Sequence, residues 1–310
     1  MASPEEEEMS DKKPWHGVNL ATTLPFNEDL TVAYDAYAEH VRFTTAGGVT
    51  GIIPNGSLGE YQTLTQDERK QVFLTAVEAS PEGTAVIPGV GAYGALESVR
   101  LAEHAAENGA PAVMLLPPNA YRASDEEIVD HYRRVAAVGL PILAYNNPID
   151  TKVDLHPALL ARLHSEGLIV SVKEFSGDVR NSYAIRELAP GLDISIGSDD
   201  VVFELGINGA IGWIAGYPNA IPESTVELYN LSTSGNPADW KRAHEIHVDL
   251  HPLLRWDSKS LFVQAIKLSQ QVAGVAPAGI TTRPPRLPLP DHIRDQIIAD
   301  TEAVLAKGYR

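Results

Sequence analysis

The sequence predicts a closed (β/α)8 barrel followed by a C-terminal helical extension, and three observations lead to this prediction. Short apolar runs alternate with longer amphipathic stretches, which is the pattern of parallel strands covered by helices on both faces. Eight such runs occur, and eight strands fit a closed barrel better than an open doubly wound sheet, which usually has fewer. Beyond residue 219 the chain becomes mainly helical, and the first of these helices closes the barrel.

The predicted elements follow one another in regular order. The strand candidates are 16–24, 49–55, 84–90, 111–117, 141–147, 168–174, 193–199 and 210–216. The helix candidates are 31–46, 65–79, 95–108, 124–137, 155–165, 178–188, 219–232, 237–254, 258–273 and 291–307. Two helix starts carry the spacing of a capping box, at Thr65 with Glu68 and at Ser124 with Glu127.

We divide the chain into a disordered acidic tail (1–14), the barrel (15–233) and the helical extension (234–310). The start, MASPEEEEMSDKK, lacks the apolar segment of a signal peptide. No apolar run approaches the roughly 18 residues that a membrane span needs. We therefore expect a cytoplasmic protein that has no contact with a membrane.

Charge and composition exclude several classes of function. A net charge of −17 over 310 residues argues against nucleic acid and against an anionic membrane surface, since both need a basic face. Small anionic substrates stay compatible with this charge, because a pocket can be locally positive. The absence of cysteine excludes disulfides, thiolate catalysis and metal sites built on cysteine.

Lys173 ends the apolar run LIVSVKEFSG, where a buried ammonium group is costly. A barrel carries its chemistry at the C-terminal ends of its strands. An amine whose pKa is lowered by burial becomes a nucleophile that can form a Schiff base with a carbonyl substrate. The alternative is a structural lysine paired with a carboxylate at the rim. Glu174 is a poor partner for it, because neighbours along a strand point to opposite faces.

Other predicted strand ends carry polar groups as well. Tyr145, in PILAYNNP, can transfer protons beside an amine, although it can also be a core tyrosine. Gly56, Ser57 and Leu58, in NGSLGE, offer consecutive N–H groups and one hydroxyl to a carboxylate, although the segment can be an ordinary loop. Ser198, in GSDD, is a further candidate for substrate binding. Together, these residues at separate strand ends favour an active site.

Two other motifs do not support a cofactor or metal site. Residues 89–94, GVGAYG, match the dinucleotide fingerprint, but the following strand ends in MLLPPN without the required acidic residue. His244, His247 and His251 share one helical face, but HEIHV is not the H-E-x-x-H motif. We therefore expect a solvated or interface helix face there, and neither a metal nor a cofactor in the protein.

The ordered motifs GSLGE with TLTQDE, YNNP, VKEFSG and GSDD resemble the dihydrodipicolinate synthase/N-acetylneuraminate lyase family. The resemblance runs from about residue 16 to about residue 305. It implies a (β/α)8 barrel with a C-terminal helical extension, assembled as a homotetramer, a dimer of dimers. It also implies a class I aldolase-type lyase that binds a small 2-oxo acid such as pyruvate covalently to a lysine, without a cofactor or metal.

The resemblance also implies roles for individual residues. Lys173 matches the Schiff-base lysine and Tyr145 matches the proton-transferring tyrosine. Ser57 would stand in the proton relay to Tyr145, and the turn from Gly56 to Leu58 would hold the substrate carboxylate.

Three departures argue against the reaction after which the family is named. Dihydrodipicolinate synthases carry two adjacent threonines where this chain has Ser57 and Leu58. Their paired tyrosines after the fourth strand lie against Asn119 and Ala120. Asp150 replaces the arginine that binds the carboxylate of the second substrate, and this reversal of charge repels an anionic partner. The sequence thus predicts a lyase that acts on a 2-oxo acid by aldol cleavage or condensation, dehydration or deamination.

Three alternatives remain open at this point. The segments YNNP, GWIAGYPNAIP and RPPRLPL look most like pyrroline-4-hydroxy-2-carboxylate deaminases. A barrel that keeps the lysine but lacks turnover would be a 2-oxo acid binding protein, and measured turnover separates it from an enzyme. A metal-dependent aldolase of similar fold would be sensitive to EDTA.

Overall fold

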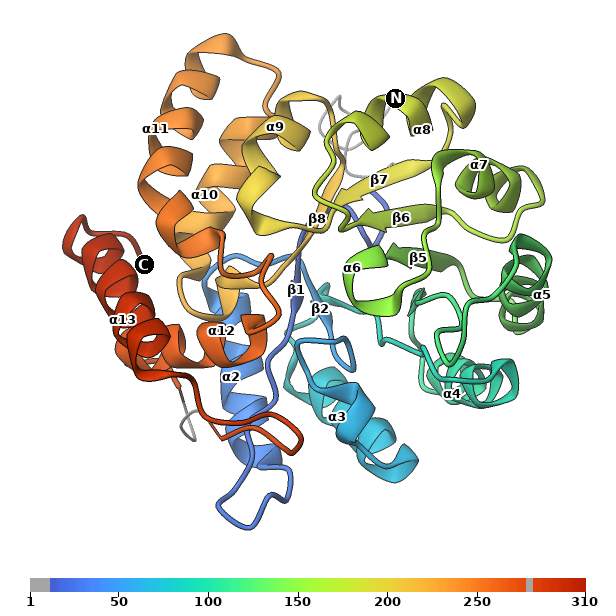
Figure 1. The fold of residues 1–310 in the computed structure, drawn as a ribbon, viewed down its shortest axis with the longest axis horizontal. Helices are drawn as coiled ribbons and strands as arrows, with labels where there is room; N and C mark the ends of the chain where they lie inside the picture. The colour runs from blue at the N-terminus through green and yellow to red at the C-terminus, as the bar shows by residue number, and fades with distance from the viewer. Residues whose placement is uncertain (1–11, 277–280) are drawn as a thin grey trace.

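The computed structural model describes residues 12–276 and 281–310, and its centre is a barrel of eight parallel strands (Figure 1). The strands are β1 (Gly17–Ala21), β2 (Gly51–Ile53), β3 (Ala85–Val86), β4 (Val113–Leu115), β5 (Ile142–Asn146), β6 (Ser171–Glu174), β7 (Asp193–Ile196) and β8 (Gly212–Ala215). Their order is β3-β2-β1-β8-β7-β6-β5-β4. A parallel bridge between Gly89 and Met114 joins the two ends of this order, so the sheet closes on itself.

All eight predicted strands are confirmed, and each is shorter than its apolar run. The predicted runs included residues that leave the ladder at the strand ends and enter the turns above the barrel. Asn55, for example, is the last residue of the predicted run 49–55, but it lies beyond the end of β2 at Ile53 and has a φ of 60°, which is not a strand conformation. These turns carry the residues that surround the barrel mouth.

Helices cover the outer face of the barrel (Figure 1). They are α2 (Tyr34–Ala46), α3 (Gln66–Ala79), α4 (Ala95–Glu107), α5 (Asp125–Ala136), α7 (Pro157–Ser165), α8 (Arg180–Leu188), α9 (Val202–Ile207) and α10 (Pro222–Thr233), with the short α6 (Pro148–Thr151) above β5. Both predicted capping boxes form at the starts of α3 and α5. Helices α6 and α9 escaped the sequence analysis because they have only 4 and 6 residues, too few to show a helical period.

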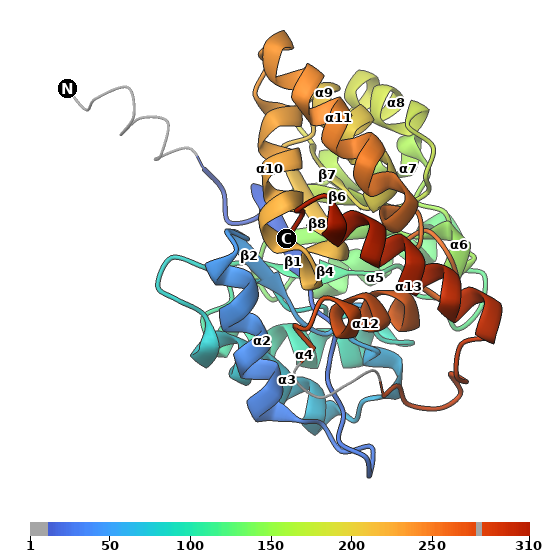
Figure 2. The same ribbon diagram turned by 90° about the vertical axis from the view of Figure 1, so that its left-hand side faces the viewer.

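The C-terminal extension consists of α11 (Pro237–Leu254), α12 (Phe262–Val272) and α13 (Asp291–Ala306). Helix α11 packs on α10, and α13 packs on both α11 and α12, so that the three helices lie along one side of the barrel (Figure 2). The boundary predicted between residues 233 and 234 stays a prediction, because α10 and α11, which lie on either side of it, pack on each other.

Most of the predicted N-terminal tail lies outside the described residues, which begin at Lys12. The end of that tail is bound to the barrel. Lys13 Nζ lies 3.2 Å from the Asp193 carboxylate, and the Trp15 indole donates to the same carboxylate at 2.8 Å. Lys13, which the prediction assigns to the tail, thus contacts the barrel at Asp193.

Within residues 12–276 and 281–310, no helix combines the length and the apolar character that a bilayer crossing requires.

The extension fixes the turn that follows β2. Lys267, on α12, donates to the Glu60 carboxylate at 2.8 Å and to the Thr281 carbonyl at 2.8 Å. The backbone N–H of Arg283 donates to the second oxygen of Glu60 at 3.0 Å. Both side chains of the Lys267–Glu60 pair are buried, with exposed fractions of 3% and 0%. The turn from Gly56 to Glu60 is thus held from its far end by the C-terminal part of the chain.

We expect Lys267→Met to destabilise the protein by about 3–5 kcal/mol, because it leaves the Glu60 carboxylate buried without its ion-pair partner. Urea unfolding of both proteins measures the loss. The matched control is Lys307→Met, which removes an exposed ion pair with Asp249 and should cost about 1 kcal/mol or less. Equal losses in the two variants would contradict the assignment of Lys267 as the anchor of this turn.

Candidate active site

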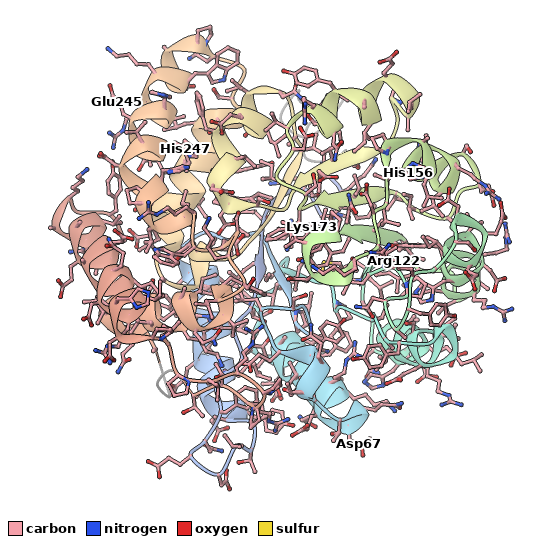
Figure 3. All side chains as sticks on the ribbon, in the orientation of Figure 1. Asp67, Arg122, His156, Lys173, Glu245 and His247 are labelled. Atoms are coloured by element: carbon pink, nitrogen blue, oxygen red, sulfur yellow. The ribbon has the colours of Figure 1, made fainter. Side chains whose placement is uncertain are left out.

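Lys173 and Tyr145 lie side by side inside the barrel. They are register partners on the neighbouring strands β6 and β5, and paired residues of parallel strands point to the same face. Lys173 Nζ lies 4.4 Å from the centre of the Tyr145 ring and 5.4 Å from the centre of the Phe175 ring. Figure 3 shows Lys173 near the centre of the barrel, whereas His247 lies on an outer helix. Both Lys173 and Tyr145 are buried.

Glu174 does not pair with Lys173. Its carboxylate accepts from the Asn146 side-chain amide at 3.1 Å and from the Ser176 N–H at 2.7 Å. Asn146 is the register partner of Glu174, so this pair alternates with the Tyr145–Lys173 pair along the two strands. The alternative of a structural lysine neutralised by Glu174 therefore finds no contact to support it.

Burial controls the protonation of the lysine. It lowers the pKa of Lys173 to about 8, against the opposing effect of two carboxylates, Asp257 and Asp199. Burial likewise raises the pKa of Asp199 to about 7, although Asp199 accepts hydrogen bonds from the N–H groups of Tyr217 and Gly216 at 2.7 and 3.1 Å. Lys173, Asp199 and Asp257 are thus three ionisable side chains that are buried close to one another.

A small cavity opens beside these groups. Five of the residues predicted from the sequence line it, namely Gly56, Ser57, Leu58, Tyr145 and Lys173. The sequence analysis missed Asp257, Met114, Phe175 and Phe262, which line the same cavity. Phe175 follows Lys173 closely along the chain, but Asp257 and Phe262 come from the extension, and no motif marks them.

Backbone N–H groups of the turn after β2 are free to bind an anion. The carbonyls of Gly56 and Ser57 accept from the N–H groups of Gly59 and Glu60, each at 3.1 Å. None of the hydrogen bonds recorded in the described part of the chain uses the N–H of Ser57 or Leu58. Two adjacent amides at the edge of a cavity form a favourable environment for a carboxylate.

Asp150 lies close to the site, but it does not line the cavity. It is exposed on α6, and its carboxylate accepts from the Asn147 side-chain amide at 2.9 Å. The same amide nitrogen donates to the Tyr145 hydroxyl at 3.2 Å, so Asn147 connects the two residues. Ser198, also predicted as a site residue, is buried outside the cavity lining, whereas the adjacent Asp199 acts on Lys173.

The glycine-rich segment 89–94 has a structural explanation. The buried Arg69 side chain donates to the carbonyls of Gly89 and Gly91 at 2.9 and 3.0 Å. A Cβ atom at Gly89 would lie 2.3 Å from the Asn55 carbonyl oxygen, so only glycine allows this contact with the turn after β2. The segment therefore supports that turn, in agreement with the rejection of a dinucleotide site.

His244 and His247 of α11 pack against α9, whereas His251 is exposed. The ring of His247 stacks on Phe203 with 6.0 Å between ring centres, and burial lowers the pKa of His247 to about 4. His244 packs with its edge against the same Phe203 ring. Over residues 12–276 and 281–310, no group of three or more potential ligands among His, Asp and Glu is arranged to hold a metal ion. His244 and His247 belong to an interface between helices.

A closed parallel barrel with a buried lysine of lowered pKa, beside a tyrosine on the neighbouring strand, is the arrangement of a class I lyase, an enzyme that works through a lysine imine. The chain belongs to the dihydrodipicolinate synthetase family, whose sequence model matches residues 14–304. The family resemblance and the fold predicted from the sequence are thereby confirmed.

Individual relatives agree with this membership. A 4-hydroxy-tetrahydrodipicolinate synthase from Methanothrix thermoacetophila is 33% identical over 282 residues, which cover 89% of this chain and 91% of the relative. The crystal structure of dihydrodipicolinate synthase from Aquifex aeolicus has a TM-score of 0.86 at 27% identity and covers 95% of this chain and 98% of its own. YagE, a prophage protein of E. coli K12 solved in complex with pyruvate, has a TM-score of 0.87 at 24% identity, covering 94% and 98%.

Proposed function

We propose that the protein forms a Schiff base between Lys173 and a 2-oxo acid and uses this imine to break or form a bond further along the substrate. The observation that carries the proposal is the position of Lys173. Its amine, with a pKa of about 8, borders a small cavity that also contains the Tyr145 ring and the turn from Gly56 to Leu58. A 2-oxo acid has a carboxylate next to a ketone. The carboxylate can accept from the backbone N–H groups of Ser57 and Leu58, and the ketone can react with the amine of Lys173.

The proposed steps follow from this arrangement. The N–H groups of Ser57 and Leu58 bind the substrate carboxylate, so that the adjacent C2 carbonyl carbon faces the Lys173 amine. Attack by the neutral amine gives a carbinolamine. The Tyr145 hydroxyl, with Ser57 as a second hydroxyl, transfers protons between nitrogen and oxygen while water leaves. The resulting iminium cation withdraws electrons from the carbon chain.

The charge at Asp150 argues against condensation with an anionic aldehyde. Two like unit charges about 6 Å apart at an effective dielectric constant near 20 repel by roughly 3 kcal/mol, and solvent reduces this value at an exposed residue. The carboxylate of Asp150 is near enough to the cavity to raise the pKa of Tyr145, after the larger effects of burial and Asp257. We therefore propose an activity other than that of a true dihydrodipicolinate synthase, although the curated relative named above carries that activity in its name.

A panel of 2-oxo acids tests this proposal. Each acid is incubated with the protein and reduced with borohydride, and the intact mass of the protein identifies the trapped intermediate. Steady-state assays of aldol cleavage, dehydration and ammonia release are run in parallel, with and without EDTA. We expect an adduct with pyruvate, turnover of at least one larger 2-oxo acid, and no useful rate with pyruvate plus aspartate semialdehyde.

The other possible outcomes of this panel distinguish between the alternative functions. Ammonia release from a cyclic imine would select the activity resembling pyrroline-4-hydroxy-2-carboxylate deaminase. An adduct without any turnover would indicate a binding protein, and loss of activity in EDTA would indicate a metal-dependent aldolase. Efficient dihydrodipicolinate formation would overturn the argument from Asp150. No adduct with any 2-oxo acid would refute the Schiff-base proposal itself.

The proposal extends to the assembly and the cellular location of the protein. We propose a homotetramer that works in the cytoplasm, on the basis of the family resemblance and of exposed apolar side chains such as Tyr93, Leu96 and Tyr121. Solved relatives include a dihydrodipicolinate synthase variant described as monomeric, so membership of the family does not determine the assembly. The native mass of the protein in solution distinguishes a tetramer from a monomer.

A further inference from the structure

Asp257 is a carboxyl group that the C-terminal extension inserts into the barrel. It lies in the connection between α11 and α12 and lines the same cavity as Lys173. Its exposed fraction is 5%, and one carboxylate oxygen accepts from the Asp199 N–H at 3.3 Å. The other oxygen faces the end of β8, where a Cβ atom at Gly216 would lie only 2.7 Å from it. The position of the carboxyl group is thus defined from two sides.

The cavity offers few other groups that can accept a proton from carbon. Lys173 is consumed when the imine forms, and most of the remaining lining residues are apolar. Burial, together with the neighbouring Asp257, raises the pKa of Tyr145 far above its ordinary value, so its phenolate is a costly species. Among the residues of the described chain that line this cavity, Asp257 alone carries a carboxyl group.

The charges of Lys173 and Asp257 depend on each other. Burial and the nearby Asp199 raise the pKa of Asp257 well above its ordinary value, and the positive charge of Lys173 lowers it again. An iminium at Lys173 keeps this positive charge, which favours the ionised form of the Asp257 carboxyl group. If the substrate then loses a proton from C3, the iminium becomes a neutral enamine. A proton moved from C3 to the carboxylate removes both buried charges in one step, which a site of low polarity favours.

We propose that Asp257 is the base that removes a proton from C3 of the substrate after the substrate has formed an imine with Lys173. This inference rests on the proposed function. In the step, the C3–H bond breaks and its electron pair forms the C2=C3 double bond. The electron pair of the C2=N double bond moves to nitrogen, which becomes neutral, and the proton binds to the carboxylate of Asp257. In the reverse direction the same carboxyl group protonates C3 of the enamine.

Exchange of the methyl protons of pyruvate tests this step by itself. In D2O, an enzyme that interconverts iminium and enamine replaces the methyl protons by deuterium, and the loss of the methyl proton signal in NMR measures the rate. We expect Asp257→Asn to form the borohydride adduct at a rate within about threefold of the wild type. Its exchange should fall by about 10²-fold or more, since the amide cannot accept the proton.

The matched control is Asp200→Asn. Asp200 is a partly exposed neighbour of Asp199 that accepts from the Ser258 hydroxyl at 2.7 Å and lies outside the cavity lining. This variant should keep both the adduct and the exchange. If Asp257→Asn forms the adduct and retains the exchange rate of the wild type, another group takes the proton and the inference is wrong.

Two further measurements separate the possible failures. If the wild type forms no adduct with pyruvate, the proposed function fails, and this inference fails with it. If Asp257→Asn does not fold, Asp257→Ala is assayed with and without formate, a small carboxylate that can enter the space left by the side chain. Exchange that returns with formate supports the inference, whereas exchange at the wild-type rate without formate overturns it.

Discussion

Lys173→Met should abolish the borohydride adduct with every 2-oxo acid and lower turnover by at least about 10³-fold, because no other amine lines the cavity described around this residue. Methionine loses the contacts of the ammonium group with the Tyr145 and Phe175 rings, but it keeps most of the volume of the lysine side chain, so the space beside these rings stays filled. The two carboxyl groups that lose their cation can bind protons. We therefore expect a folded but inactive protein. Peptide mapping of the reduced wild-type protein should locate the adduct at Lys173.

The matched control is Lys259→Met, which removes an exposed lysine from the connection between α11 and α12 and should leave adduct and turnover unchanged. A modified peptide that contains Lys259 or Lys152 would show that the assignment of Lys173 is wrong.

The rate of adduct formation should also depend on pH. The attacking amine must be neutral, so the rate should rise as the pH increases through about 8, the pKa to which burial lowers Lys173. At pH 7 about one amine in ten is then neutral, against about one in three thousand at the ordinary pKa of 10.5. A rate that rises only above pH 10 would indicate an ordinary lysine.

Tyr145→Phe should lower turnover by about 10²- to 10⁴-fold while the protein stays folded. The substitution keeps the ring, which packs with its edge against Phe175 and lies below the Lys173 amine. It removes only the hydroxyl, to which Asn147 donates at 3.2 Å. Since this hydroxyl is proposed to transfer protons during formation of the imine, the adduct should form more slowly. Asp257→Asn, in contrast, should leave adduct formation nearly unchanged.

The control for this variant is Tyr229→Phe, which removes the hydroxyl of another buried tyrosine, on α10 and outside the cavity. Turnover should then stay near that of the wild type. If Tyr145→Phe retains near-wild-type turnover, a water molecule or another hydroxyl carries the proton.

The fold was largely accessible from the sequence, because its signals are local. Apolar runs and amphipathic periods depend on neighbours along the chain, so they predicted the eight strands and the long helices. Helix α9, with 6 residues, has too few turns for a period, and the sequence analysis missed it. The glycines at 89 and 91 matched a dinucleotide motif, and only the tertiary contacts with Arg69 and Asn55 account for them.

The residues of the candidate site also fall into two groups, those that the sequence predicts and those that only the tertiary structure identifies. Lys173, Tyr145 and Ser57 end strands or follow them directly, and all parallel strands of a barrel end at the same face, so the sequence alone determined that these residues lie together. Asp257 lies 84 residues beyond Lys173 in a connection between two helices, with no motif and no strand to place it. Only the packing of the extension against the barrel decided that this carboxyl group shares a cavity with the lysine. A contact between segments that are distant in the sequence depends on the tertiary fold, so local sequence patterns do not predict it.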